Sequence, residues 1–216
     1  MTEGALLGWR VLEIADGVAA TFCGKVLSDL GAEVVKVEPP GGHPLRMLGP
    51  AGPGTERARF TYLHTGKSSG VVSDDDAGTM LMRDLLADAH VLVTDSDEAD
   101  LGHRGEPPEG LIRVSIRPFG LTGPSAGLPA HHLTVFHSGG EGSILPSGPC
   151  YSMFPDRPPL QIGGGVADYD AGWNAAVAVL AAMWGLARTG HARSIDVSMQ
   201  ESQLTLNRTR LSRFNN

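Results

Sequence analysis

The chain has little that marks a secreted, membrane-bound or disulfide-stabilised protein. It has two cysteines in 216 residues, Cys23 and Cys150, far apart in sequence, and Cys23 falls on the apolar face of a predicted helix. A buried free thiol of this kind is typical of a reducing compartment. No run of 18 apolar residues occurs, and the N-terminus lacks the basic-then-apolar pattern of a signal sequence. We therefore expect a cytoplasmic protein with no membrane partner.

The chain also lacks an excess of positive charge and a dinucleotide-binding glycine motif. Its formal net charge is -7, so we expect no nucleic-acid partner. Residues 15–20, after the first predicted strand, read ADGVAA and contain no GxGxxG pattern. Without those glycines the backbone does not approach a pyrophosphate closely, and Glu38 alone is weak evidence for a ribose contact. The sequence therefore predicts no NAD cofactor.

A strand–helix–strand unit stands near the start of the chain. Residues 11–14 are a short β-prone run, and residues 19–30 carry apolar side chains at helical spacing. Gly31 is placed to end this helix, because glycine readily adopts the left-handed conformation that follows a helix. Residues 34–37 form the next predicted strand, before the turn PPGG. A unit this compact predicts a parallel crossover and a Rossmann-like sheet.

The rest of the chain continues the alternation of strands and helices. The pattern predicts a helix after the acids at 74–76, strands at 89–93 and 111–116, and a long loop system over 118–165 with a helical turn at 133–137. A strong helix follows at 168–188, rich in alanine, with Trp173, Val177 and Trp184 on one face, then a strand at 194–197 and a helix from 199 to 211. This order predicts an α/β fold, an open and mostly parallel sheet flanked by helices.

Several short sequences stand in a fixed order along the chain: VLEI and LSDLGAEVVKVEPPGG, then GLTGP at 120–124, VAD at 166–168 followed by Ala171-Gly172, RTG at 188–190 and IDVS at 195–198. In kind and order they resemble the motifs of the family III CoA-transferases, which include formyl-CoA transferase, carnitine CoA-transferase and α-methylacyl-CoA racemase. The resemblance implies that residues 1–200 form the family's Rossmann-like large domain. Residues 201–216 are then the start of a helical linker or a truncated tail, without the later small domain and chain return.

The resemblance implies that Asp168 is the catalytic nucleophile. In the family this carboxylate attacks an acyl-CoA thioester and forms an aspartyl anhydride and then an aspartyl-CoA thioester. From the residues alone, an aspartate that opens a helix is also a common capping residue. Asp170 is the nearest competitor for the role. The glycines before it, Gly163, Gly164 and Gly165, are placed to let backbone amides approach a developing oxyanion, or else form a flexible turn.

A second catalytic candidate is His131, because the racemase branch has a histidine in this neighbourhood that acts with the aspartate as an acid–base pair. Racemisation needs two poised groups on opposite faces of the α-carbon. His132 stands where that branch has an aspartate, so transferase and racemase both stay open. His131, His132 and His137 lie close together in sequence, but no cysteine or carboxylate has ligand spacing to them, so no metal is predicted.

Coenzyme A carries phosphates, so its binding needs bases. Arg46 follows the second predicted strand, where such folds bind ligands. Lys67 lies in LHTGKS, which resembles the family's NxxKRS segment. Both are predicted phosphate contacts. His64 and Ser68 replace an asparagine and an arginine of that segment, and TDSDE at 94–98 stands in place of an NFRPG-like sequence.

The resemblance also implies partners. The substrates are an acyl-CoA and a carboxylic acid acceptor, and relatives form interlocked homodimers. We expect such a homodimer, or a complementing chain. The apolar runs at 144–146 and 151–154 are candidates for an acyl tunnel or for interface packing. A non-catalytic CoA-binding or assembly half is the alternative outside the enzyme class.

Overall fold

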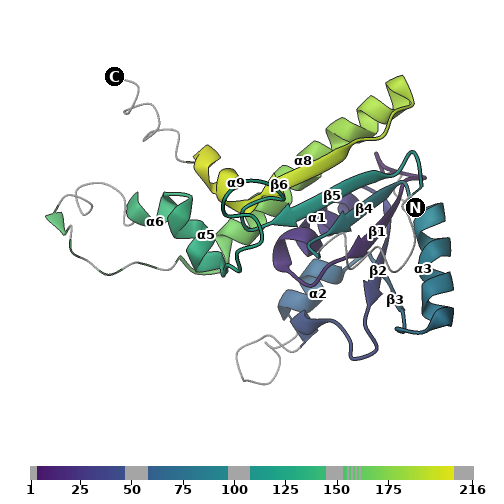
Figure 1. Ribbon diagram of the computed structural model, residues 1–216, viewed down its shortest axis with the longest axis horizontal. Coiled ribbons are helices and arrows are strands. Elements are labelled where there is room, and N and C mark those ends of the chain that lie inside the picture. Colours follow the sequence, from purple (N-terminus) through teal and green to yellow (C-terminus); the bar gives the residue numbers. More distant parts are fainter. Residues whose placement is uncertain are drawn as a thin grey trace.

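Six parallel strands form one open sheet in the computed structural model, which describes residues 4–46, 58–96, 108–144, 153–154, 156, 158, 160 and 162–206. The strands are β1 (Arg10–Ile14), β2 (Glu33–Glu38), β3 (Ser68–Val71), β4 (Val91–Thr94), β5 (Ile112–Arg117) and β6 (Ser194–Ser198). Their order is β3-β2-β1-β4-β5-β6 (Figure 1). This arrangement confirms the predicted α/β class with a Rossmann-like sheet.

The described helices flank the sheet. They are α1 (Val18–Asp29), α2 (Ala58–His64), α3 (Asp76–Asp88), α5 (His132–Ser138), α6 (Glu141–Ile144), α8 (Val166–Thr189) and α9 (Met199–Leu206), with a 3-10 turn η1 (Pro44–Arg46). The helix predicted over 199–211 is described as far as Leu206, and the residues after it lie outside the described part. The same holds for Cys150 and for most of the two apolar runs at 144–146 and 151–154. The predicted domain division after residue 200 stays a prediction.

The central strands are buried on both faces, as parallel strands usually are. Val11 of β1 pairs with Val34 of β2 on one side and with Val91 of β4 on the other. All four residues of β4 are buried. The continuous apolar runs that predicted these strands are therefore explained by helices covering both sides of the sheet.

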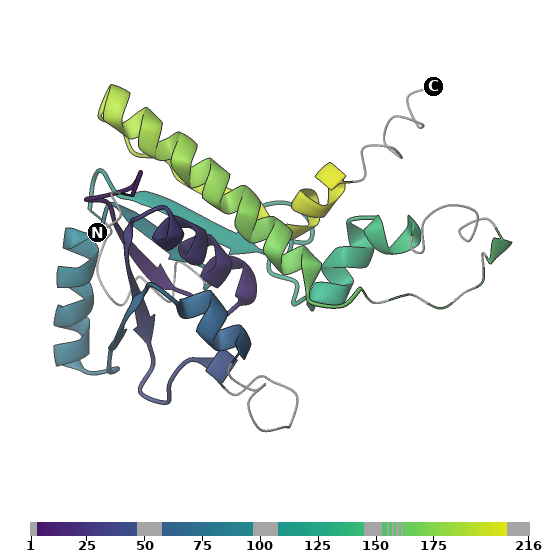
Figure 2. The same cartoon turned by 180° about the vertical axis from the view of Figure 1, so that it is seen from behind.

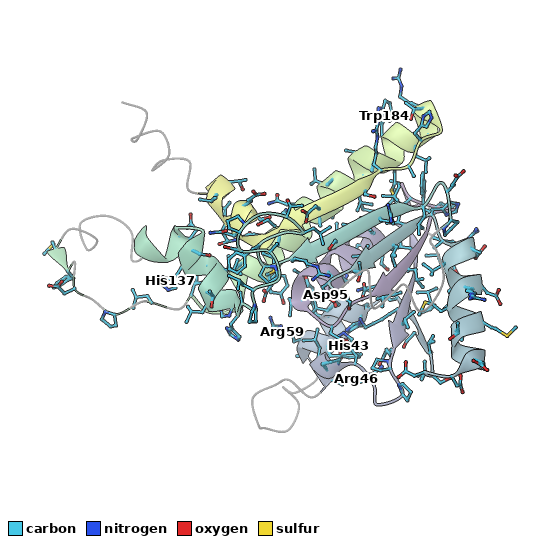
Figure 3. The ribbon with its side chains drawn as sticks, in the orientation of Figure 1. His43, Arg46, Arg59, Asp95, His137 and Trp184 are labelled. Carbon is cyan, nitrogen blue, oxygen red and sulfur yellow. The ribbon has the colours of Figure 1, made fainter. Side chains whose placement is uncertain are left out.

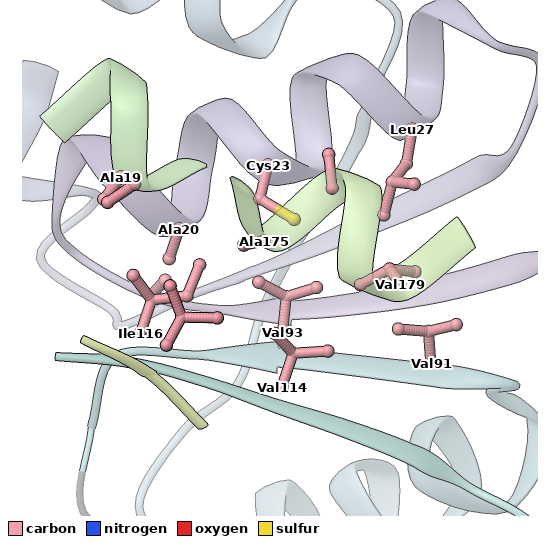
Figure 4. Packing of buried hydrophobic residues seen from close by; sticks show 14 of the residues in the cluster. Ala19, Ala20, Cys23, Leu27, Val91, Val93, Val114, Ile116, Ala175 and Val179 are labelled. Carbon is pink, nitrogen blue, oxygen red and sulfur yellow. The ribbon is translucent and has the colours of Figure 1, made fainter. Parts of the chain in front are cut away.

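Two hydrophobic layers lie between the helices and the sheet, one on each face of the sheet. Helices α1 and α8 cover one face, where Cys23 and Leu27 of α1 and Val179 of α8 pack on β4 and β5 (Figures 2 and 4). Helix α3 covers the other face through Met82 and Leu86. Cys23 is fully buried, which confirms the predicted buried thiol, and burial raises its pKa to about 12.

Helices α1 and α8 approach each other closely because the residues between them are small. Ala171 and Ala175 of α8 are fully buried in this layer. A methyl group at Gly172 would lie 2.5 Å from the carbonyl oxygen of Ala19, which is shorter than any normal contact. The alanine density of this segment therefore has a packing role, since it lets α8 lie close against α1.

Three large apolar side chains of α8 lie on the face away from this layer. Trp173, Val177 and Trp184 are 56%, 63% and 67% exposed, and Trp184 lies near the projecting end of the helix (Figure 3). The helix is thus apolar on both faces, and alanines make much of its core contact, together with Val179 and Met183. Even so, no helix among the described residues combines the length and apolarity needed to span a membrane.

Candidate active site

Asp168 lies in the first turn of α8. The helix begins at Val166, two residues earlier than predicted, after Gly165 with φ +72° and ψ 43°. The Asp168 amide donates a hydrogen bond to the Gly165 carbonyl oxygen at 3.0 Å. A carboxylate in this turn is favoured by the helix dipole, as any acidic residue would be. Its surroundings therefore decide whether it has a chemical role.

Those surroundings are basic. The nearest cation is Arg59 of α2, whose Nη2 lies 4.0 Å from Oδ2 of Asp168, and the carboxylate side chain is 17% exposed. Burial raises the pKa of Asp168, while the charges of His132, Arg59 and His131 act to lower it. Among the described residues, none is within hydrogen-bond distance of this carboxylate group. We call Asp168, Arg59, His131 and His132 the Asp168 cluster.

The two histidines stand at the start of α5. His131 is the N-cap residue, and its Nδ1 lies 3.3 Å from Nδ1 of His132, so one ring must donate and the other accept. Nε2 of His132 is buried and has no partner among the described residues. The fold thus brings the predicted pair His131 and Asp168 to one place, although the acid–base role of His131 stays a prediction. Sequence analysis missed Arg59 and gave His132 no role.

Two of the three glycines before α8 have open surroundings. A methyl group at Gly163 or at Gly164 would meet no described atom within 4 Å, and Gly164 has φ +85°. A methyl group at Gly165 would lie 3.0 Å from Nη2 of Arg59 and 3.1 Å from Oδ2 of Asp168. The predicted binding of an oxyanion by these amides stays a prediction, but Gly165 borders the space between the two charged groups.

Lys67 is not presented to a ligand, which departs from the predicted phosphate contact. Its side chain is 1% exposed, and its Nζ donates to Oε2 of Glu13 at 2.6 Å and to the Thr21 carbonyl oxygen at 2.7 Å. Burial lowers its pKa, and Glu13 opposes that shift. The family-like LHTGKS segment therefore places this lysine inside the molecule, where the structure gives it an internal ion-pairing role.

Lys67 belongs to a buried ion network with Glu13 and Lys36, which we call the Glu13 network. Oε1 of Glu13 accepts from Nζ of Lys36 at 2.9 Å, and both side chains are almost fully buried. Gly24 of α1 makes room for this network, because a methyl group there would overlap Oε2 of Glu13. The glycine weakens the helix interior slightly and permits the carboxylate to approach.

Arg46 remains half-exposed beside a cavity. Its guanidinium donates two hydrogen bonds to Glu38, at 2.7 and 2.9 Å, and these bonds are the largest cause of a Glu38 pKa lowered to about 2. The cavity, of about 180 Å³, lies at the carboxyl ends of β1 and β2 and is lined by Asp16, Glu38 and Asp74 among others. The phosphate contact of Arg46 stays a prediction, and the acids of the lining distinguish this cavity from a basic phosphate site.

Asp95 occupies the N-terminus of α1. Its carboxylate accepts from the amide of Gly17 at 2.6 Å and from that of Asp16 at 3.2 Å. These are the amides that bind a pyrophosphate in a dinucleotide-binding fold. A carboxylate already lies there, which adds a physical reason to the sequence argument against NAD. Among the described residues, no group of three or more His, Cys, Asp or Glu is arranged to hold a metal ion.

Comparison with known proteins identifies the class. The family described as CoA-transferase family III matches residues 6–213. The chain therefore belongs to CoA-transferase family III, as its motifs indicated.

Particular relatives agree with this assignment. The chain is 33% identical to succinyl-CoA–D-citramalate CoA-transferase of Chloroflexus aurantiacus over 91% of its length and 50% of the relative. It is 32% identical to succinate–glutarate CoA-transferase of Agrobacterium fabrum, over 92% and 52%. A CAIB/BAIF family protein from Brucella suis superposes with a TM-score of 0.87 at 29% identity, over 98% of this chain and 57% of that one. The chain thus spans about half the length of the curated relatives it matches.

Proposed function

We propose that this chain transfers coenzyme A from an acyl-CoA thioester to a carboxylic acid, with Asp168 as the covalent nucleophile. The observation that carries the proposal is a carboxylate in a basic surrounding with no hydrogen-bond partner among the described residues. Family membership supports CoA transfer in general. The covalent route through Asp168 and the kind of substrate are what we add to that general activity.

The chemistry needs only one nucleophile. A carboxylate oxygen of Asp168 attacks the thioester carbonyl carbon, the carbon–sulfur bond breaks, and CoA thiolate leaves a mixed anhydride. The thiolate then attacks the aspartyl carbonyl, which releases the first acid and gives an aspartyl-CoA thioester. An incoming carboxylate repeats the two steps in reverse and leaves with CoA. An ionised aspartate needs no activating base for these steps.

The surroundings of Asp168 fit these steps. Its partial burial removes water from the nucleophile, because only 17% of the side chain is exposed. Burial raises the pKa of Asp168, and the nearby positive charges oppose that rise. A fully hydrogen-bonded carboxylate would be a poorer nucleophile, since its lone pairs would already be engaged. Gly165 has no side chain to cover Oδ2, since a methyl group there would lie 3.1 Å from that oxygen.

Intact-mass measurement tests the proposal. The full protein is mixed with succinyl-CoA or acetyl-CoA without an acceptor acid, and an adduct with the mass of a CoA thioester is expected on Asp168. Asp168→Ala removes the nucleophile and should abolish the adduct. Asp170→Asn is the matched control on the same helix, because Asp170 already accepts from Gln203 at 2.9 Å and should not be needed. An adduct that persists in Asp168→Ala would contradict the proposal.

A racemase is the second candidate, and the nearness of His131 and His132 to Asp168 favours it. That activity would exchange the α-proton of an acyl-CoA with deuterated water in the absence of an acceptor acid. Exchange without an aspartyl adduct would replace the transferase by the racemase. Tight CoA binding with neither result would indicate the non-catalytic CoA-binding half.

We also infer that the exposed stripe of Trp173, Val177 and Trp184 is a binding surface for another protein chain. A run of large apolar side chains on one helix face is typical of an interaction site. The occupant is another copy of the chain in a homodimer, or a complementing chain. The mass of the assembly in solution, measured by sedimentation, tests this.

A further inference from the structure

A small space separates the carboxylate of Asp168 from the guanidinium of Arg59. The position that a methyl group at Gly165 would occupy lies 3.0 Å from Nη2 of Arg59 and 3.1 Å from Oδ2 of Asp168. Apart from the residues next to Gly165 in the chain, no third described atom lies within 4 Å of that position. Gly165 therefore borders the 4.0 Å gap between a nucleophilic oxygen and a cationic N–H donor, and no third described group outside residues 164–166 reaches that border.

The dimensions of this space suit a carbonyl group. A reactive complex places the carbonyl carbon about 3–3.5 Å from the attacking oxygen. The carbonyl oxygen stands about 1.2 Å further on and must lie about 2.7–3.1 Å from a donor that stabilises its negative charge. Nη2 of Arg59 and Oδ2 of Asp168 are 4.0 Å apart, so a two-atom carbonyl group has room to contact both. A shorter, direct ion pair would leave no such room.

Arg59 is positioned by the packing of α2, and its guanidinium keeps N–H donors available for a ligand. Helix α2 is anchored by Leu63, which is fully buried, and by Phe60, whose ring stacks on His64 with a centroid distance of 4.0 Å. Arg59 itself is 39% exposed, and its one ion pair with a described residue is the 4.0 Å contact with Asp168 (Figure 3). A guanidinium carries its charge at every accessible pH and presents several N–H donors.

We propose that Arg59 is a catalytic residue whose guanidinium binds the carbonyl oxygen of the thioester that Asp168 attacks, an inference that rests on the proposed function. As Oδ2 bonds to the carbonyl carbon, the π electron pair moves onto the oxygen, and the guanidinium donates hydrogen bonds to the oxyanion. When the carbonyl re-forms, the carbon–sulfur bond breaks and CoA leaves as the thiolate. No proton moves in these steps, so a permanent cation suits them better than a general acid.

The first test compares rates of adduct formation on Asp168, followed by rapid quenching and intact mass. Arg59→Gln should slow the adduct at least 100-fold, as loss of one oxyanion donor does in other enzymes. Arg59→Lys keeps the charge and should restore part of the rate. Added methylguanidinium should accelerate Arg59→Ala, which a merely structural role would not allow. Arg10→Gln is the matched control, because Arg10 is 41% exposed and pairs with Asp88 at the amino end of the central strand β1.

The second test fills the space. Gly165→Ala places a methyl group between the two charges and should slow adduct formation strongly. Gly190→Ala is its control, because Gly190 has the same φ of +72° and open surroundings at the other end of α8. Both variants put alanine at a left-handed position with φ +72°, so an effect confined to Gly165→Ala measures the filled site. Unfolding midpoints check that both are folded.

The outcomes separate the two proposals. If the unsubstituted protein forms the Asp168 adduct and Arg59→Gln forms it within about threefold of the same rate, Arg59 is not catalytic, and the proposed function stands. An unchanged rate in Gly165→Ala overturns the inference in the same way. If the unsubstituted protein forms no Asp168 adduct, the proposed function fails and the inference fails with it.

Discussion

Two clusters in this protein have similar composition and opposite construction. In the Glu13 network, each carboxylate oxygen has a lysine within 2.6–2.9 Å, and the three side chains are 0–1% exposed. In the Asp168 cluster, the nearest cation is 4.0 Å away and both partners are partly exposed. Both place one carboxylate among basic groups close to helix α1 or α8. The difference lies in how completely each carboxylate is satisfied.

The contrast separates a group that holds the fold together from a group that is available for chemistry. A buried ion pair must recover its lost hydration through well-formed hydrogen bonds, or it destabilises the protein. The Glu13 network does this, with backbone carbonyls of Ala15 and Thr21 accepting from the lysines as well. Among the described residues Asp168 has no hydrogen-bond partner, which suits the nucleophile that we propose.

Glu13→Gln is expected to have the largest effect. It removes one charge and leaves Lys36 and Lys67 buried without a counter-ion, which should lower the free energy of unfolding by about 3–5 kcal/mol. Urea unfolding followed by circular dichroism measures the change. Glu33→Gln is the control, because Glu33 is an exposed glutamate at the start of the neighbouring strand. A loss below about 1 kcal/mol would show that the network contributes no more than a surface pair.

Lys67→Met is expected to have an intermediate effect. Glu13 keeps Lys36, but Oε2 of Glu13 and the Thr21 carbonyl oxygen lose their donor, so stability should fall by about 1–3 kcal/mol. The KM for acyl-CoA should stay unchanged, because the ammonium group is not presented to a ligand. A rise in KM without loss of stability would restore the phosphate contact that the sequence predicted.

Much of the fold was predictable from the sequence because its strands and helices are locally marked. The apolar runs of β1, β2, β4 and β5 and the alanine-rich α8 were all predicted. Strand β3 and helix α2 were not. The sequence of β3, SSGV, has no apolar pattern, and it forms an edge strand through its pairing with β2. Helix α2 has seven residues, and its position depends on packing against α1 and η1.

The candidate site was predictable only where a motif marked it. Asp168 and His131 were found from the family resemblance, and the sheet and helix packing then brings them together. Arg59 carries no local signal, since its approach to Asp168 depends on how α2 packs relative to the start of α8. Lys67 shows the opposite limit. A segment that resembled a ligand-binding motif places its lysine in an ion pair with Glu13. The two residues are far apart in sequence, so this contact could not be predicted from the local pattern.

Asp168→Asn is expected to have the smallest effect on stability. Unlike the two preceding substitutions, it should raise the free energy of unfolding. Burial raises the pKa of Asp168 in the folded protein, so the folded state holds the proton more tightly than the unfolded state. Stability due to this group therefore falls as the pH rises from its ordinary value of 3.8 through the raised one. Asparagine cannot ionise, so the variant should be slightly more stable than the unsubstituted protein at pH 7.

The difference should shrink below pH 3.8, where the unsubstituted carboxyl group is also neutral. Urea midpoints at pH 7 and pH 3.5 measure it, and the adduct on Asp168 should be lost in the same variant. A variant that is less stable at pH 7 would mean that the ionised Asp168 is satisfied in the folded protein. The carboxylate would then resemble Glu13, and the physical reason for assigning chemistry to it would disappear.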